Sequence, residues 1–189
     1  MRPVITTVGH STRTADTFIE LLREAGIELL VDVRAFPSSR RNPQFNSGTL
    51  AQVLALVGIG YRHAPALGGR RQPDTAASRP DGSPNASPNG GWREPAFRAY
   101  ADYALSAVFA VALDQVLRDA GGAPTAIMCA EAAWQSCHRR IIADHLVARG
   151  AAVRHVVAAG RIEPAVLTPG AAVRADRTVI YPPDQPRLL

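Results

Sequence analysis

The feature that most constrains the fold of this chain is an alternation of strand-length apolar runs with helix-length amphipathic segments. Residues 4–10 (VITTVGH) and 27–33 (IELLVDV) have the length and composition of strands. The second run is nearly continuous, as expected for a strand that is covered on both faces. Between them, residues 14–26 place apolar side chains on one helical face, with Thr14 as the expected N-cap and Gly26 as the stop.

The same alternation continues along the chain. It predicts helices over 47–58, 94–122 (one helix or two) and 137–149, and strands over 59–63, 124–130, 152–157 and, weakly, 178–181. Strands separated by helices indicate a parallel sheet with right-handed crossovers. The predicted fold class is α/β: a single domain over residues 1–182, with an open, mainly parallel sheet of four to six strands and helices on both faces. Residues 183–189 are expected to be a C-terminal tail.

One segment interrupts this alternation of strand and helix signals. Residues 68–92 are rich in Gly, Pro, Ser and Asn and have almost no apolar content. Loops of this length in compact domains are either functional or disordered. We expect a mobile surface loop at 70–92, and we favour an insertion without function over a substrate lid.

The charged residues narrow the chemistry. All 21 basic residues are arginine, which excludes Walker-type phosphate lysines and Schiff-base lysines. The formal charge is +5, and residues 33–71 contain six arginines but no acid. This stretch is either an ordinary solvated surface or an anion-binding face, since the guanidinium fork suits phosphate and carboxylate.

The sequence also indicates a compartment. It has no apolar stretch of roughly 18 residues that could span a membrane, and its first residues do not resemble a signal peptide. We therefore expect a soluble, cytoplasmic protein without a membrane partner. In that compartment the two cysteines should stay reduced, so each thiol is reactive, metal-binding or simply buried. The oligomeric state is not predicted.

Polar side chains recur where the predicted strands end. Because ligands bind beyond the carboxyl ends of parallel strands, we expect these side chains to converge on one site. They are His10 and Ser11 after the first strand, Asp32 and Arg34 at the second, Arg62 and His63 at the third, and Cys129 and Glu131 at the fourth. Asp32 and Arg34 should point the same way, and Arg34 is expected to keep donors free for a ligand.

Both cysteines lie in one stretch, MCAEAAWQSCHRRIIADHL (128–146). Cys137 stands near the predicted helix start, beside His138 and Arg139, where the helix dipole and cations favour the thiolate. Cys129 ends an apolar strand, so burial is its commoner role. Neither cysteine is followed by arginine at the Cys-x5-Arg spacing of phosphatase or rhodanese-like loops. Seven residues between the cysteines also do not match the usual zinc spacing. No cofactor or metal site is predicted, although Cys129, Cys137 and His138 together could hold a metal.

Several motifs carry a resemblance to a known family. TVGHS, DVRAFPSSRRNPQFN, YRHAPALGGR, FRAYADY, the stretch 128–146 and AAVRHV occur in this order over residues 6–157. The chain resembles the bacterial family called domain of unknown function 488. The resemblance implies an α/β fold and a shared polar site, without a reaction. The family's signature residues correspond to His10, Ser11, Asp32, Arg34, Arg40, Cys129, Glu131, Cys137, His138 and Arg139.

The first functional hypothesis is an enzyme, a cysteine-dependent hydrolase or transferase, acting on an anionic substrate that contains phosphate, such as a nucleotide or nucleic acid. Cys137 would attack, and His10 or His138 would move the proton. Glu131 would orient His138 or Arg139. The predicted catalytic group is Cys137, His10, His138, Glu131 and Asp32, and the predicted substrate-binding group is Ser11, Arg34, Arg40, Arg139 and Cys129.

Two alternatives stay open. One is a nucleic-acid-binding module without catalysis, in which arginines contact phosphates and aromatic rings stack on bases. Its residues would be Arg34, Arg40, Arg41, Arg62, Phe36, Phe45 and Tyr61. The other is a metal-binding or redox-sensing protein that uses Cys129, Cys137 and His138. The salt dependence of binding would identify the first, and metal analysis of fresh protein would identify the second.

Overall fold

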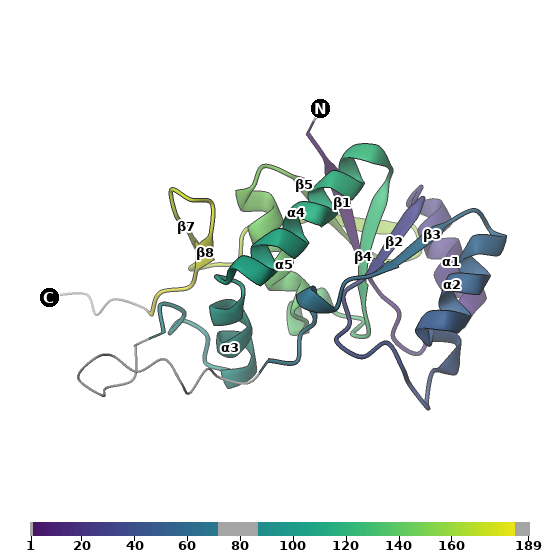
Figure 1. The fold of residues 1–189 in the computed structure, drawn as a ribbon, viewed down its shortest axis with the longest axis horizontal. Coiled ribbons are helices and arrows are strands. Elements are labelled where there is room, and N and C mark those ends of the chain that lie inside the picture. Colours follow the sequence, from purple (N-terminus) through teal and green to yellow (C-terminus); the bar gives the residue numbers. More distant parts are fainter. Residues whose placement is uncertain (1, 72–86, 184–189) are drawn as a thin grey trace, which may run out of the picture.

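The computed structural model describes residues 2–71 and 87–183, which build one six-stranded sheet in the order β3-β2-β4-β1-β5-β6 (Figure 1). The first five strands along the chain are parallel, and β6 runs antiparallel to β5. This confirms the predicted α/β class. The strands are β1 (Val4–Gly9), β2 (Leu29–Asp32), β3 (Gly60–His63), β4 (Thr125–Cys129), β5 (Ala152–Ala158) and β6 (Arg161–Pro164).

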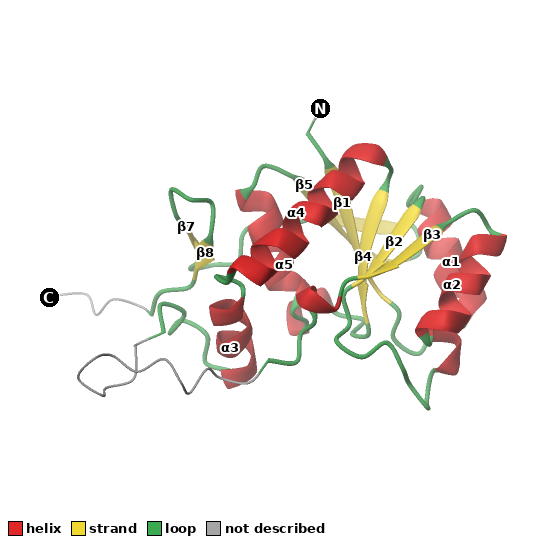
Figure 2. Cartoon of the chain, viewed as in Figure 1, coloured by secondary structure: helices red, strands yellow, loops and turns green. Residues whose placement is uncertain are grey.

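Helices cover both faces of the sheet (Figure 2). Apolar side chains of α1 (Ala15–Glu24) and α2 (Ser47–Leu56) share one buried cluster on one face. Those of α4 (Ala107–Gly122) and α5 (Arg139–Ala148) share a second cluster, which extends to α3 (Pro95–Tyr103). None of the described helices alone is both long and apolar enough to cross a membrane; α3 and α4 reach that length only together, and they meet at 78°.

Local sequence signals set the ends of these elements. The Thr14 hydroxyl accepts a hydrogen bond from the Thr17 amide at 3.2 Å, which caps α1. Gly26 then adopts a φ of +66°, a conformation that glycine reaches without a steric penalty. Pro95 opens α3, where its missing N–H costs nothing. These boundaries lie where the periodicity predicted them.

The C-terminal part of the chain differs from the prediction. β6 was not expected, because it is short, carries charged side chains and ends in Pro164, as an exposed edge strand can. The weak strand predicted at 178–181 does form, as β8 (Val179–Ile180). It pairs with β7 (Ala172–Val173) in a separate two-stranded sheet and does not join the main one.

The predicted loop at 70–92 is described only in part, because residues 72–86 lie outside the described residues, as do 184–189 of the predicted tail. The far end of the loop is anchored. The Ser87 hydroxyl and the Asn89 amide donate to the Asp102 carboxylate at 2.6 and 2.7 Å. The Gly91 amide donates to the Tyr181 carbonyl at 2.8 Å. These bonds fix the chain as it enters α3.

Candidate functional site

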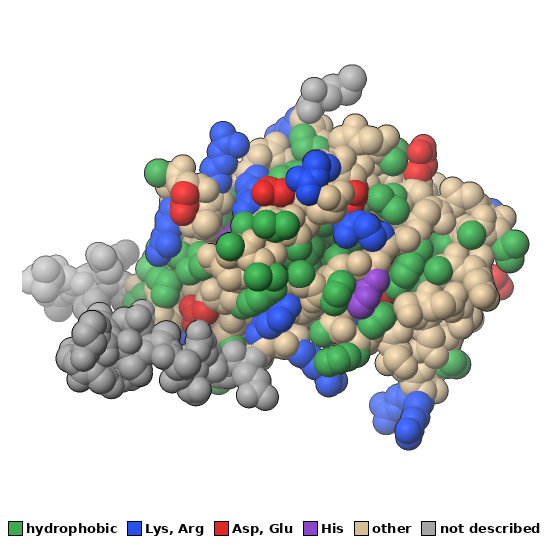
Figure 3. Space-filling model, viewed as in Figure 1, with side chains coloured by type: hydrophobic (Ala, Val, Ile, Leu, Met, Phe, Trp, Pro, Cys, Tyr) green, Lys and Arg blue, Asp and Glu red, His purple; other side chains and the backbone are tan. Residues whose placement is uncertain are grey.

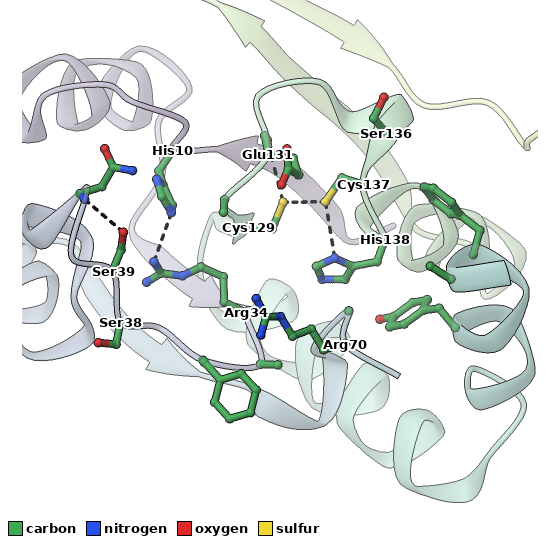
Figure 4. A pocket seen from close by; sticks show the side chains of 18 residues that line it. His10, Arg34, Ser38, Ser39, Arg70, Cys129, Glu131, Ser136, Cys137 and His138 are labelled. Atoms are coloured by element: carbon green, nitrogen blue, oxygen red, sulfur yellow. Dashed lines mark hydrogen bonds between the residues drawn. The ribbon is translucent and has the colours of Figure 1, made fainter. Parts of the chain in front are cut away.

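A pocket of about 570 Å³ opens at the carboxyl ends of the parallel strands (Figure 4). Most of its polar residues come from the segments after β1, β2 and β4, which are far apart in the sequence, and Arg70 and Tyr100 come from the loop after β3 and from α3. Cysteine and histidine side chains from the β4–α5 connection lie on one side, and His10 with Arg34 lies on the other. The lining includes His10, Arg34, Phe36, Ser38, Ser39, Arg70, Phe97, Tyr100, Cys129, Glu131, Ser136, Cys137 and His138.

The strand order explains this convergence. β4 lies between β1 and β2, with Gly9 beside Cys129 and Asp32 beside Met128. The pairing continues past the strands, since the His10 amide donates to the Cys129 carbonyl at 3.0 Å. Three chain segments therefore leave the sheet side by side. Of the strand-end residues expected to converge, His10, Arg34, Cys129 and Glu131 line the pocket, whereas Ser11, Asp32, Arg62 and His63 do not.

The two cysteines are in direct contact at this edge. Cys129 ends β4, and the chain returns through a short 3-10 helix, η3 (Trp134–Ser136), to Cys137. The two Sγ atoms are 2.6 Å apart, and both side chains are buried from bulk solvent. The Cys129 thiol also points to the Glu131 carbonyl oxygen at 3.9 Å.

His138 lies next to the Cys137 sulfur. Its Nδ1 is 3.5 Å from Cys137 Sγ, and its Nε2 is 3.2 Å from the Val33 carbonyl oxygen. Because a carbonyl oxygen can only accept, Nε2 carries a proton, and a second proton on Nδ1 would face the sulfur. Gly69 packs on the ring, so a Cβ at this position would lie 2.4 Å from Nδ1. Of the predicted proton carriers, His138 is the one in contact with the Cys137 sulfur.

The surroundings of the two thiols affect them in opposite directions. Burial acts to raise the pKa of Cys137, but hydrogen bonds from Cys129 and His138, with the charges of His138 and Arg139, outweigh it and lower the pKa. Burial and the neighbouring Cys137 raise the pKa of Cys129. These surroundings therefore favour the thiolate form at Cys137 and the thiol form at Cys129.

Buried groups of the protein bind the Arg34 guanidinium. Its Nε and Nη2 bind the carboxylate of the fully buried Asp32, with Nη2 to Oδ2 at 2.5 Å. Nη2 also donates to the Phe45 carbonyl at 2.7 Å, and Nη1 lies 3.2 Å from His10 Nε2. Among the described residues, one Nη1 hydrogen is left without a partner. Arg34 was expected to keep donors free for a ligand, but Asp32, Phe45 and His10 take all of them except this one N–H.

His10 supports Arg34 in this arrangement. Its Nδ1 donates to the Ser11 carbonyl at 2.8 Å, which leaves Nε2 to accept from Arg34. Its ring stacks on Phe45 with centroids 4.2 Å apart. Burial is the main cause that lowers the pKa of His10 to about 4, so the ring is neutral at pH 7. Ser11, in a left-handed conformation (φ 51°), contributes backbone groups to these contacts.

Arg139 and Glu131 do not have the predicted roles. Arg139 is fully buried and does not line the pocket, and its Nη2 donates to the Glu131 backbone carbonyl at 2.5 Å. It has no acidic partner among the described residues, where its Nε and Nη1 also lack an acceptor. Arg139 thus supports the loop under the cysteines, and the Glu131 carboxylate has no hydrogen bond to it.

The arginine-rich stretch does not form one binding face. Arg40 is exposed and outside the pocket lining. Arg62 pairs with Asp119, and Arg71 stacks on Tyr103 at 3.6 Å. On the face drawn in Figure 3, described arginines are scattered singly among apolar and uncharged atoms. Sequence reasoning included Arg70 in this stretch but not among the predicted site residues, and it lines the pocket from the loop after β3.

Cys129, Cys137 and His138 also present a candidate metal-ligand set, with their ligand atoms within 4.8 Å of one another. Two thiolates on a tetrahedral zinc ion would lie about 3.8 Å apart, given Zn–S bonds of about 2.3 Å. The observed separation is 2.6 Å. The arrangement in this structure fits a thiol pair better than two ligands of one ion.

Fold and site together define an open α/β protein with a cysteine, histidine and arginine pocket at the carboxyl edge of its sheet. The chain belongs to the family described as Domain of unknown function DUF488, whose model matches residues 14–146. The match includes both cysteines and begins after His10 and Ser11. The chain has no match among curated proteins, and none among solved structures.

Proposed function

We propose that this protein is an enzyme that uses the Cys137 thiolate as a nucleophile on a small anionic substrate. The observation that carries the proposal is the position of Cys137 Sγ in the pocket lining, with Cys129 Sγ at 2.6 Å and His138 Nδ1 at 3.5 Å. A thiolate beside an imidazolium is an activated nucleophile, and the imidazole can return the proton to a leaving group. A hydrolase or a transferase could use this chemistry.

The buried charge of Arg139 supports the thiolate. A guanidinium out of water without a counter-charge is costly, and Arg139 has no carboxylate partner among the described residues. Its charge lowers the pKa of Cys137. A negative Cys137 supplies the counter-charge that this arginine otherwise lacks, so the ionised state suits both groups.

The proposal that the substrate is anionic rests on the arginine side chains that line the pocket. Arg70 is exposed at the lining, with its guanidinium carbon 5.9 Å from the Phe36 ring centre, and Arg34 offers one N–H. Phe36, Phe97 and Tyr100 supply apolar walls. This combination suits a small molecule that carries a phosphate or carboxylate beside an apolar part.

The nucleic-acid-binding alternative has less support. Arg34 and Phe45 are buried, Arg62 is paired with Asp119, and the Tyr61 hydroxyl donates to Asp32. Of the side chains proposed for that role, the exposed ones are Phe36, Arg40 and Arg41. Three exposed side chains form a small surface for tracking a phosphate backbone.

Alkylation kinetics test the proposal. Iodoacetamide should label Cys137 quickly at pH 6, well below the reference thiol pKa of about 8.5, and Cys137→Ser should remove this labelling. Anionic iodoacetate should react faster than neutral iodoacetamide, relative to a free thiol, and Arg70→Ala should reduce that preference. Arg118→Ala, an exposed arginine on α4, is the matched control. Slow labelling of both cysteines until the protein is denatured would reject the proposal.

A further inference from the structure

The contact between the two sulfur atoms goes beyond what a single nucleophile needs. Non-bonded heavy atoms normally pack at about 3.5 to 4.0 Å, and a disulfide bond is about 2.05 Å long. Cys129 Sγ and Cys137 Sγ, at 2.6 Å, are closer than ordinary packing contacts. Each sulfur is thus the nearest reaction partner of the other.

The two cysteines are also placed differently with respect to the pocket. The Cys137 sulfur has the His138 imidazole beside it. Cys129 lies at the end of β4, and burial with the neighbouring Cys137 raises the pKa of its thiol, which favours a proton on its sulfur. One activated thiolate in contact with one protonated thiol is the arrangement of a nucleophilic cysteine and a resolving cysteine.

We propose that Cys129 and Cys137 form a redox pair that exchanges with a small disulfide carrying carboxylates. This inference rests on the proposed function, since Cys137 is again the nucleophile, and it names the bond attacked as S–S. A hydrolase or a simple transferase does not need a second thiol as a reactant. In disulfide exchange the second thiol completes the reaction.

The steps balance without another reactant. The Cys137 thiolate attacks one sulfur of the disulfide R–S–S–R, so a Cys137–S–S–R bond forms and one thiolate RS⁻ leaves. Cys129 then loses its proton to the departing thiolate and attacks the Cys137 sulfur. The Cys129–Cys137 disulfide forms and the second RS⁻ leaves, to be protonated by solvent. The protein loses two electrons, and the substrate gains them as it becomes two thiols.

The pocket fits this class of substrate. A volume of about 570 Å³ lies in the range of small-molecule sites. Arg70 and the remaining N–H of Arg34 can bind carboxylates, while Phe36 and Phe97 can pack against the carbon chain. His138 Nδ1 lies 3.5 Å from Cys137 Sγ, the sulfur that Cys129 attacks in the second step.

The test uses the reduced protein and oxidised glutathione as an anionic disulfide. After an acid quench, intact mass spectrometry should show wild-type protein that has lost two hydrogens, with two glutathione thiols released per chain. Cys129→Ser should stop at the mixed disulfide and release one thiol. Cys137→Ser should do neither. Wild-type protein that accumulates the mixed disulfide, or a Cys137→Ser variant that reacts at the wild-type rate, would overturn the inference.

Further arms separate this inference from the proposed function. If iodoacetamide labels Cys137 rapidly but oxidised glutathione leaves the protein reduced, the nucleophile stands and the redox pair is rejected. If neither reagent reacts, both proposals are rejected. Neutral hydroxyethyl disulfide should react at least tenfold more slowly than oxidised glutathione, relative to their rates with a free thiol, and equal relative rates would reject the anionic substrate. If Cys129→Ser fails to fold, Cys129→Ala replaces it. The wild-type products, which are the protein disulfide and the released thiols, then still test the inference without a Cys129 variant.

Discussion

Arg34 and Arg139 are both buried at the carboxyl edge of the sheet, yet they differ in the counter-charge that lies beside them. Arg34 is 7% exposed and is bound to the buried Asp32 carboxylate. Arg139 is fully buried, touches two backbone carbonyls and has no acidic partner among the described residues. The first charge is neutralised inside the fold, and the second remains to act on the cysteines. A buried arginine can therefore stabilise structure or tune a neighbour, depending on where its counter-charge lies.

The largest expected effect, a loss of stability, comes from removing the counter-charge of Arg34. Asp32→Asn leaves the Arg34 guanidinium buried without its counter-charge, which should lower the free energy of unfolding by about 3 to 5 kcal/mol. Urea denaturation measures this loss. Asp119→Asn is the matched control, because its partner Arg62 is partly exposed and the pair should contribute less than about 1 kcal/mol. Equal losses in the two variants would remove the distinction between the buried pair and the partly exposed one.

A smaller effect is expected on the Arg139 side, and it should appear in the thiol. Arg139→Met keeps the length of the side chain but removes the charge, so the Cys137 pKa should rise by about one unit, equivalent to about 1.4 kcal/mol. At pH values at which Cys137 is only partly ionised, the alkylation rate of this variant should be up to tenfold lower than that of the wild type. Arg149→Met, at the C-terminal cap of the same helix but paired with Asp114, should leave the rate unchanged.

Arg34→Met sharpens the same experiment. Made together with Asp32→Asn, Arg34→Met leaves the net charge unchanged, so this pair of substitutions should shift the Cys137 pKa much less than Arg139→Met does. A shift of the same size in both variants would contradict the difference between the two arginines.

The smallest expected effect is the contribution of His10 to the pH dependence of the free energy of unfolding. Burial lowers the folded-state pKa of His10 from 6.5 to about 4, so the unfolded chain binds the proton more readily between these values. Stability should therefore fall as the pH decreases from 7 to 6, by about 0.7 kcal/mol from this residue. His10→Gln should remove that part of the loss. An unchanged slope of unfolding free energy against pH would show that His10 does not contribute.

Much of the fold was predictable, because its signals are local. The apolar run of β2, the Thr14 cap and the Gly26 stop each depend on a few neighbouring residues. Convergence at one sheet edge was also predictable, since parallel strands share a direction. β6 was missed because an exposed edge strand needs no apolar pattern.

The roles within the site were less predictable, since they depend on side-chain directions. Spacing placed Arg139 beside Cys137, but the first turn of α5 points it under the loop and away from the pocket. Arg34 follows Asp32 by two residues, and the chain beyond β2 turns the guanidinium back onto the carboxylate. Arg70 reaches the pocket from a loop, where no periodicity applies.

The position of β4 has a consequence for the order of folding. β1 and β2 each pair with β4 and not with each other, although more than ninety residues separate β2 from β4. Until residues 125–129 have emerged from the ribosome, β1 has neither of its two neighbours, and the cysteine loop does not yet exist. Pairings so distant in sequence form slowly, because a long loop must close first. Chain synthesis and sheet closure are thus coupled, and the pocket is assembled only after residues 125–138 have been translated.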